Sequence, residues 1–289
     1  MECNTEKNKI SFIGGDERML FAAGEFARDG FDVSVCGFDI STGEYGNIRR
    51  ENELYGALDG ARYVILPLPY SRDGANVNAP FFSENISVAD IFATADERVY
   101  ILGGMLGGEF LKRERTVDYY AREDFAVLNS VPTAEGAVKF AVEETKRTLC
   151  GMNVAVLGFG RVGKVLAKTL TSLGANVTVF ARSAEARAWA KVFFCRPLAF
   201  SKLYEHIGDF GCIFNTVPQT VMGERELARV KRGSVIIELA SAPYGVDAKT
   251  AERMGVRVCP APSLPGRITP KTAGNIIYET LKEIMEEEK

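Results

Sequence analysis

The chain has 289 residues, of which 46% are hydrophobic and 25% are charged. These are ordinary values for globular proteins, and they exclude a disordered, collagen-like or coiled-coil chain. A net charge of −3 argues against a nucleic-acid-binding protein, and the length favours two domains.

Charge is distributed unevenly along the chain. Residues 1–130 carry 13 Lys and Arg against 22 Asp and Glu, a net charge of −9, whereas residues 131–289 carry 22 against 16, a net charge of +6. We therefore expect an anionic ligand in the second part. Six scattered cysteines with no Cys-x-x-Cys pair, and a single histidine, predict neither a metal site nor a disulfide framework. Because the first residues and the rest of the chain lack long apolar stretches, we expect a cytoplasmic protein without membrane contact.

The first 130 residues contain short apolar runs that end at Gly or Pro and are followed by helical patterns. We expect parallel strands over residues 10–13, 33–35, 63–66 and 99–102, joined by crossover helices such as residues 18–29. The Gly14-Gly15 pair after the first run is most simply a tight turn between a strand and a helix.

A last short strand is predicted over residues 126–129, before a long amphipathic helix that reaches about residue 149 and links two domains. Thr133 is the expected N-cap of this helix. Glu135 then has two open interpretations, as a proton acceptor or as an acidic residue that stabilises the first helical turn.

A glycine-rich loop follows the branched strand predicted over residues 153–157. The loop consists of Gly158, Phe159, Gly160, Arg161, Val162 and Gly163, and it opens a helix over residues 164–173 that leads to a strand over residues 176–180. This context is typical of dinucleotide binding. Gly158 makes the turn, Gly160 admits the diphosphate to the backbone, and Gly163 allows close packing of helix and strand.

The end of the next strand distinguishes the two nicotinamide dinucleotides. An NAD-specific site places Asp or Glu there for the ribose 2′-hydroxyl, but this chain has Ala181, Arg182 and Ser183. Arginine pairs with a phosphate in bidentate fashion, and serine adds a hydroxyl donor. We therefore predict NADP, the alternative being that Arg182 is only a solvated surface charge.

Two further strands, residues 211–214 and 234–237, end in polar turns that we expect to face the nicotinamide half. The residues in these turns are Asn215, Thr216, Val217, Pro218, Ala240 and Ser241. Asn215 and Thr216 either hydrogen-bond the cofactor or cap the helix that leads to residue 230. Ser241 is a candidate substrate contact.

The strand at residues 256–259 enters a proline-rich segment, residues 260–266, which we expect to be a rigid loop without helix. A final helix then runs to about residue 287. Lys271 and Thr272 at its start either bind a substrate carboxylate or are solvated, with Lys271 also a candidate proton acceptor. Arg72, after a strand of the first domain, is a second candidate carboxylate partner.

A histidine after the late strands is absent, although hydroxy-acid dehydrogenases of this plan normally use one. His206 precedes the residue 211–214 strand and is predicted to be a surface or packing residue. A reaction that forms an aromatic ring needs a weaker proton acceptor, because aromatisation itself makes the departing proton acidic.

Taken in chain order, these segments resemble the A-subunit family of bacterial dipicolinate synthases. The most specific segments are Pro132-Thr133-Ala134-Glu135-Gly136 and Pro270-Lys271-Thr272-Ala273-Gly274, together with the glycine loop, the Asn215 turn and Leu239-Ala240-Ser241. The resemblance implies a flavodoxin-like first domain over residues 1–130, a Rossmann NADP-binding domain over residues 131–268, and a last helix, residues 269–289, that returns to the first domain. This α/β architecture is similar to that of the D-2-hydroxy-acid dehydrogenases.

The same resemblance implies a function in sporulating bacteria. Such a protein oxidises dihydrodipicolinate, a small dicarboxylate, to dipicolinate with NADP in the mother-cell cytoplasm, alongside a flavoprotein-like B subunit, and a homo-oligomer is expected. Alternatives are a 2-hydroxy-acid or amino-acid dehydrogenase of the same fold and a non-catalytic NADP-binding subunit. Three positions depart from the family pattern: Tyr70 and Tyr244 stand where glycine is usual, and Ser263 follows Pro262 in place of glycine.

Overall fold

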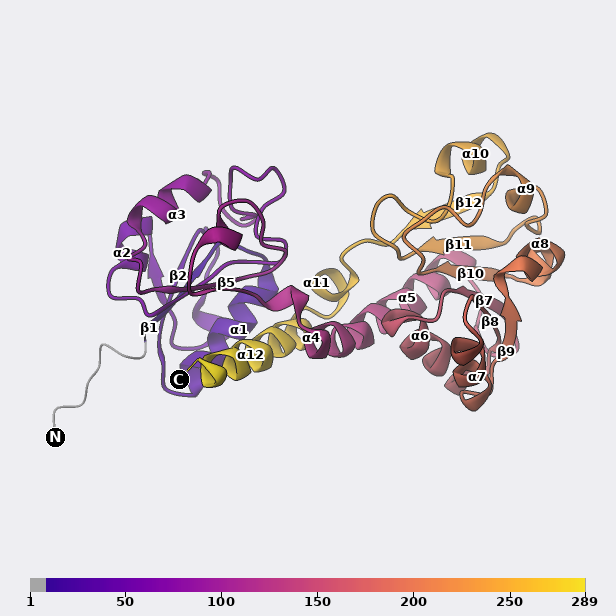
Figure 1. Ribbon diagram of the computed structural model, residues 1–289, viewed down its shortest axis with the longest axis horizontal. Coiled ribbons are helices and arrows are strands. Elements are labelled where there is room, and N and C mark those ends of the chain that lie inside the picture. The colour runs from indigo at the N-terminus through magenta and orange to yellow at the C-terminus, as the bar shows by residue number, and fades with distance from the viewer. Residues whose placement is uncertain (1–8, 289) are drawn as a thin grey trace. The chain divides into compact units, whose positions relative to one another are not determined.

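Two parallel sheets organise the chain in the computed structural model, which describes residues 9–288 (Figure 1). One compact unit runs to Asn129 and takes in the chain from Thr269 onward, and the other spans Ser130–Ile268. Cys3 and the amino-terminal residues from which the absence of a signal peptide was inferred lie outside the described residues.

The first unit has a six-stranded sheet with helices on both faces. The strand order is β3-β2-β1-β4-β5-β6, and all neighbouring strands are parallel. Without the short edge strand β3, this is the flavodoxin-like order. The strands are β1 (Lys9–Ile13), β2 (Asp32–Cys36), β3 (Arg49–Glu51), β4 (Tyr63–Ile65), β5 (Tyr100–Gly103) and β6 (Thr116–Asp118). The helices are α1 (Glu17–Arg28), α2 (Leu54–Leu58), α3 (Val88–Thr94), α4 (Glu123–Leu128) and α12 (Pro270–Glu287).

The last helix, α12, packs lengthwise against α1 and completes the core of the first unit (Figure 1). Ile277 and Leu281 are buried there. Tyr278 and Lys282 both bond the Asp29 carboxylate at the end of α1, at 2.5 and 2.6 Å. The carboxy-terminal helix is therefore part of the first unit, although the whole second unit separates the two in sequence.

The second unit repeats the doubly wound plan, with the strand order β12-β11-β10-β7-β8-β9. Counted from β7, this is the Rossmann order. Its strands are β7 (Asn153–Leu157), β8 (Asn176–Ala181), β9 (Arg196–Ala199), β10 (Cys212–Asn215), β11 (Val235–Glu238) and β12 (Arg257–Pro260). Its helices are α5 (Ser130–Thr145), α6 (Arg161–Ser172), α7 (Ala184–Val192), α8 (Leu203–His206), α9 (Glu224–Leu227), α10 (Ala248–Arg253) and α11 (Leu264–Ile268).

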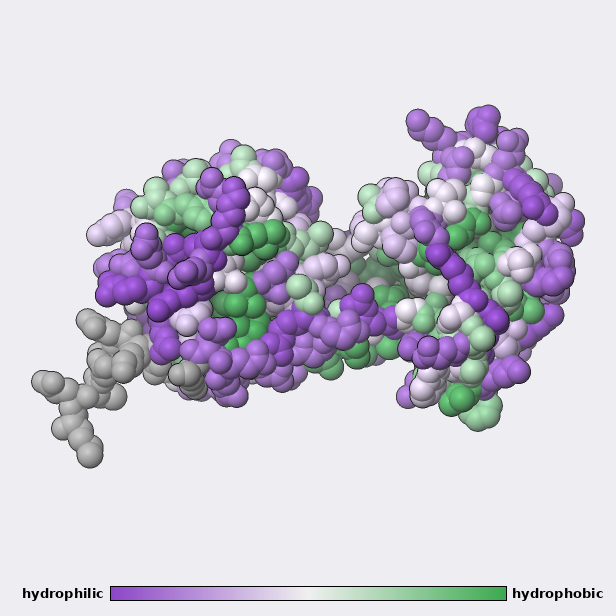
Figure 2. Space-filling model, in the orientation of Figure 1, coloured by the Kyte–Doolittle hydropathy of each residue, from purple (hydrophilic) through white to green (hydrophobic). Residues whose placement is uncertain are grey.

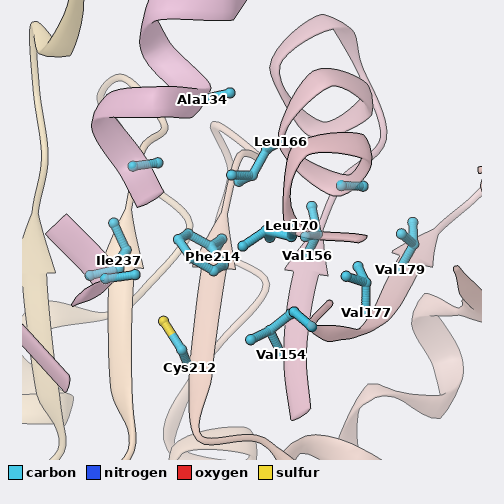
Figure 3. Packing of buried hydrophobic residues seen from close by; sticks show 14 of the residues in the cluster. Ala134, Val154, Val156, Leu166, Leu170, Val177, Val179, Cys212, Phe214 and Ile237 are labelled. Atoms are coloured by element: carbon cyan, nitrogen blue, oxygen red, sulfur yellow. The ribbon is translucent and has the colours of Figure 1, made fainter. Parts of the chain in front are cut away.

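Successive side chains of each central strand point to opposite faces of the sheet, and each face packs against its own layer of helices. Val154 and Val156 face α5 and α6, where they meet Leu166 and Leu170 (Figure 3). Ala155 and the other alternate positions face the layer that contains α8 and α10. Burial on both faces explains why these strands read as unbroken apolar runs.

Hydrophilic residues cover much of the visible face of both units (Figure 2). Exposed apolar side chains occur at the end of α7, where Val192 is 61% and Phe194 90% exposed. Within residues 9–288, no helix is long and apolar enough to cross a membrane.

The predicted strand at residues 126–129 is wrong, because these residues belong to α4 and its end. Val127 and Leu128 are 46% and 42% exposed, so they lack the burial of a central strand, and only Phe125 points inward. The edge position of the sheet is taken by β6 instead.

Helix α5 begins at Ser130 rather than after Thr133, because Pro132 is tolerated in a first helical turn, where its missing N–H is not needed. Glu135 consequently lies beyond the first turn, which contains no acidic residue, so the prediction of first-turn stabilisation is wrong. The helix ends at Thr145, earlier than expected, and Lys146 follows with a φ of 56°.

The proline-rich segment is also more regular than predicted. Pro260 ends β12, and α11 begins at Leu264. Pro265 occupies the second position of α11, where a proline costs no hydrogen bond. Leu264 is buried against α5, and a Cβ on Gly136 would lie only 2.9 Å from its Cβ.

Candidate functional site

The glycine loop of the second unit has the geometry expected of a phosphate-binding turn. Gly158 follows β7 with a φ of 93°, and a side chain there would overlap the Thr216 hydroxyl. A Cβ on Gly163 would lie 2.5 Å from the carbonyl oxygen of Gly158. Both positions therefore require glycine for reasons internal to the fold. Phe159 between them is buried and packs against Phe193.

Gly160 differs from these two glycines because no close contact within the chain requires it, beyond the general preference for glycine over alanine at an N-cap. Its φ is −78°, and a Cβ there would meet no atom within 4 Å. It caps α6 without a side-chain hydrogen bond, and the first turn of α6 has no acidic residue. The open space and the positive end of a helix together fit an approaching diphosphate.

The corresponding turn of the first unit is closed. A Cβ on Gly14 would lie 2.8 Å from Val77 and 3.1 Å from Ala79, and the Gly15 amide donates to the Asn78 carbonyl. Asp16 caps α1 and also pairs with Arg18, so the helix start already has its anion. A nucleotide phosphate is therefore accommodated by the second turn and not by the first.

The end of β8 presents basic groups and no carboxylate. Arg182 is exposed, and its guanidinium lies against the side-chain amide of Gln219, whose oxygen is the acceptor. Arg187 donates to the carbonyls of Ala181 and Arg182, at 3.1 and 2.6 Å. Gln219 and Arg187 were not anticipated from sequence, because nothing in their spacing marks them.

Ser183 is the N-cap of α7, since its hydroxyl oxygen accepts the Ala186 amide at 3.1 Å. Its O–H can still donate to a neighbouring phosphate oxygen. Ala181 is buried at the end of β8.

The turn after β10 lies directly against the glycine loop. The Thr216 hydroxyl donates to the Leu157 carbonyl at 2.8 Å, and Val217 is packed close to Gly158. Pro218 is exposed beside Gln219. The interpretation of Asn215 or Thr216 as a helix cap is wrong, because the next helix, α9, is capped by Gly223.

Asn215 is completely buried and uses its amide within the chain. It donates to the Val217 carbonyl at 3.1 Å and to Glu238 at 2.7 Å, and its oxygen accepts the Val217 amide. Its contribution is therefore to shape the turn. Glu238, which ends β11, is buried as well, and sequence reasoning passed over it. Burial raises the pKa of its carboxyl, partly offset by the N–H donors around it.

The remaining candidates are exposed and come from separate segments of the two units. Arg72 lies in a turn that is fixed by Asp73, which accepts the amides of residues 75 and 76. Lys271 and Thr272 lie in the first turn of α12 in the same unit. Glu135 and Ser241 are exposed in the second unit.

The single histidine is remote from the glycine loop. His206 lies in α8, before β10 begins, and its ring contacts the Asp209 carboxylate at 3.3 Å. The glycine loop lies beyond the carboxyl ends of the strands, at the opposite edge of the sheet. Across the described residues, no group of three or more His, Cys, Asp or Glu side chains is arranged to hold a metal ion.

Comparisons with known proteins agree with this division of the chain. Residues 9–116 match the family model for the N-terminal domain of the dipicolinate synthase A subunit. Residues 130–252 match the NAD-binding domain of D-isomer-specific 2-hydroxyacid dehydrogenases. The second unit is thus a nicotinamide-dinucleotide-binding domain of dehydrogenase type.

Relatives extend over nearly the whole chain. The dipicolinate synthase A subunit of Bacillus subtilis (strain 168) is 31% identical over an alignment of 288 residues that covers 96% of this chain and 96% of that one. The crystal structure of the dipicolinate synthase A subunit from Bacillus halodurans superposes with a TM-score of 0.87 at 29% identity, covering 96% of this chain and 97% of that one. A transhydrogenase from Sinorhizobium meliloti, 18% identical with a TM-score of 0.70 over 96% of this chain and 93% of that one, shares the fold. The chain belongs to the A-subunit family of dipicolinate synthases.

Proposed function

We propose that this protein oxidises dihydrodipicolinate to dipicolinate with NADP. The observation that carries the proposal is the open start of α6, where Gly160 leaves room that no atom of the chain fills. Membership of a family whose relatives are named as A subunits of dipicolinate synthase supplies the substrate class.

The residues around the glycine loop fit a bound dinucleotide. Backbone amides at the start of α6 would hold the diphosphate, and the turn after β10 would border the nicotinamide half together with Ala240. When bound, the oxidised nicotinamide ring supplies a hydride acceptor. The protein's own task is to orient the reactants, exclude water and receive a proton.

The preference for NADP rests on the end of β8. No carboxylate stands at residues 181–183 to accept a ribose 2′-hydroxyl, and Arg182 offers a planar cation suited to a 2′-phosphate. Gln219 lies beside that guanidinium, and Ser183 adds a hydroxyl donor.

For the substrate, the candidates are the exposed residues outside the glycine loop. Arg72, Ser241 and Thr272 would bind the two carboxylates. Oxidation of the dihydropyridine ring releases one hydride and one proton, and Lys271 or Glu135 would accept the proton. Because the product ring is aromatic, a modest base suffices.

The proposal is tested by incubating the purified chain with NADP and freshly generated dihydrodipicolinate. NADPH and the pyridine-dicarboxylate absorbance should appear together and in equal amounts, and more slowly with NAD. Oxidation of simple 2-hydroxy acids or amino acids instead would identify another dehydrogenase. Tight dinucleotide binding without turnover of any substrate would identify a non-catalytic subunit.

Substitution separates the substrate residues from the cofactor residues. Arg72→Ala and Lys271→Ala should each leave NADPH affinity nearly unchanged while greatly reducing turnover. Lys249→Ala is a suitable control, because Lys249 lies in α10, away from all candidate residues in sequence. Full turnover in both variants would refute the substrate assignment.

We also propose that a B subunit is the partner of this chain, because the relatives are named as A subunits. A homo-oligomer and the mother-cell cytoplasm of a sporulating bacterium complete the proposal. Repeating the assay with the B subunit present would show whether the partner is required for turnover.

A further inference from the structure

Both ends of the loop that follows β11, residues 239–246, are bonded to one side chain, Glu238. At the far end the Gly245 carbonyl also accepts the amides of Val221 and Met222. One carboxylate oxygen accepts the Ala240 amide at 3.0 Å, at the beginning of the loop. The other accepts the amides of Gly245 and Val246 at 3.1 and 3.0 Å, at its end. Residues 241–244 between them are exposed. The carboxylate therefore ties together the two ends of a loop whose tip is free.

The same carboxylate joins the loop to the neighbouring strand. Asn215 is the register partner of Glu238, and its amide nitrogen donates to the first carboxylate oxygen at 2.7 Å. A Cβ on Gly245 would overlap that amide nitrogen and lie 2.6 Å from the Val217 carbonyl oxygen. The base of the loop is consequently in direct contact with the turn at residues 215–217, which in turn contacts Gly158.

Burying the Glu238 carboxylate at the base of the loop carries a desolvation cost. The residue is only 5% exposed, and none of the ion pairs within residues 9–288 involves it. All four of its partners are N–H donors, which suit an ionised carboxylate because it accepts at both oxygens and has no proton to place. A buried charge of this kind is more costly than an apolar side chain, and its best-supported benefit is to specify one conformation.

We infer that Glu238 is a positioning residue, which holds the loop at residues 239–246 against the turn at residues 215–217 so that its tip is presented to the substrate. The inference rests on the proposed function, because it assigns the loop tip to the reacting end of the dinucleotide. Ser241 and Tyr244 are the side chains of the tip that would meet the ring substrate. The proposed contacts to the diphosphate at the start of α6 and to the 2′-phosphate at Arg182 come from other residues, so most of the NADPH affinity should survive a change at Glu238.

The test is Glu238→Gln, which keeps the shape of the side chain but, in either amide orientation, turns an NH₂ group toward two N–H donors. Amides of residues 240, 245 and 246 should exchange hydrogen at least about tenfold faster, as expected for loss of a charge-assisted hydrogen bond. The value of kcat should fall by a similar factor, while the Kd for NADPH changes by less than about threefold. Unchanged exchange, or faster exchange with the wild-type kcat, would overturn the inference.

Ser234→Ala is the matched control. Ser234 is also buried and precedes the other end of β11, where its hydroxyl donates to the Phe210 carbonyl at 2.6 Å. This variant should leave loop exchange and kcat at their wild-type values. A loss of kcat equal to that of Glu238→Gln would show that any buried polar defect in this strand has the same effect.

Gly245→Ala decides the question if Glu238→Gln does not fold. Its Cβ displaces the loop from Asn215 while the carboxylate stays in place, and it should reduce kcat with little change in NADPH affinity. Failure of the proposed function is distinguishable, because the wild-type chain would then show no dinucleotide-dependent turnover. Hydrogen exchange would still decide whether Glu238 holds the loop.

Discussion

Tyr244 and Ser263 both have left-handed backbone conformations, with φ values of 64° and 55°. The resemblance drawn from the sequence predicts glycine at both positions and at a third, and glycine adopts left-handed backbone without strain. The third, Tyr70, is not among the residues with positive φ. Side chains at positive φ are uncommon and cluster at functional sites.

The strain at Tyr244 is measurable by comparing two substitutions that both remove the ring. The free energy of unfolding of Tyr244→Gly should be about 0.5–1 kcal/mol higher than that of Tyr244→Ala. The alanine variant is less stable because it keeps a Cβ, which is disfavoured in left-handed backbone. Chemical denaturation of the two variants gives the difference. An alanine variant as stable as the glycine variant would show that the position is unstrained.

Burial also separates the cysteines by reactivity. Desolvation raises the pKa of the Cys212 thiol to about 12, whereas Cys150 is exposed. The thiolate is the reactive form, so iodoacetamide should leave the buried Cys212 unmodified in the folded protein even at pH 9, while it labels the exposed Cys150. Peptide mass spectrometry reads the two sites separately. Equal labelling of both would contradict the packing of β10, and labelling in denaturant is the control.

At the scale of elements, alanine substitution at two glycines of one loop should have opposite effects: one should reduce stability and the other should reduce NADPH affinity. Gly163→Ala should cost about 1–3 kcal/mol of unfolding free energy, because its Cβ meets the Gly158 carbonyl. Gly160→Ala should lower the free energy of unfolding by about 1 kcal/mol or less, because this is how much less favourable alanine is than glycine at an N-cap. It should nevertheless weaken NADPH binding at least about tenfold, because the Cβ enters the diphosphate space.

Denaturation and calorimetric titration of both variants separate these effects. NADPH affinity at the wild-type value in Gly160→Ala would mean that the diphosphate does not approach this residue. A fully stable Gly163→Ala would mean that the helix and strand are less closely packed than the structure shows.

Sequence patterns predicted the buried strands well, because a strand covered on both faces must be apolar throughout. Residues 153–157 and the glycine loop are the clearest cases. The patterns failed where context decides: Val127 and Leu128 look like strand residues, yet their helix faces solvent. Prolines misled at Pro132 and Pro265, since both lie in first turns where no N–H is required. Gln219 escaped notice because Arg182 is distant in sequence, and Glu238 because its burial and its bond to Asn215 depend on the pairing of β10 with β11.

At the scale of the molecule, the two units share one doubly wound strand order but differ in access to the first turn. In the first unit, Val77 and Ala79 fill the space beside Gly14, and Asp16 satisfies the helix start. In the second, Gly160 faces open space at a helix start without acid. We propose dinucleotide binding at the second unit because of this difference. The proposed preference for NADP rests separately on Arg182.

The most direct measurement is a calorimetric titration of the purified chain with NADPH and NADH, repeated with Arg182→Ala. We expect one site per chain, with NADPH bound at least about tenfold more tightly than NADH, as a charge-assisted contact to the 2′-phosphate implies. Arg182→Ala should lose that preference while keeping the affinity for NADH. Equal affinities in the wild-type chain would contradict the NADP assignment, and the absence of binding by both would contradict the dinucleotide site itself.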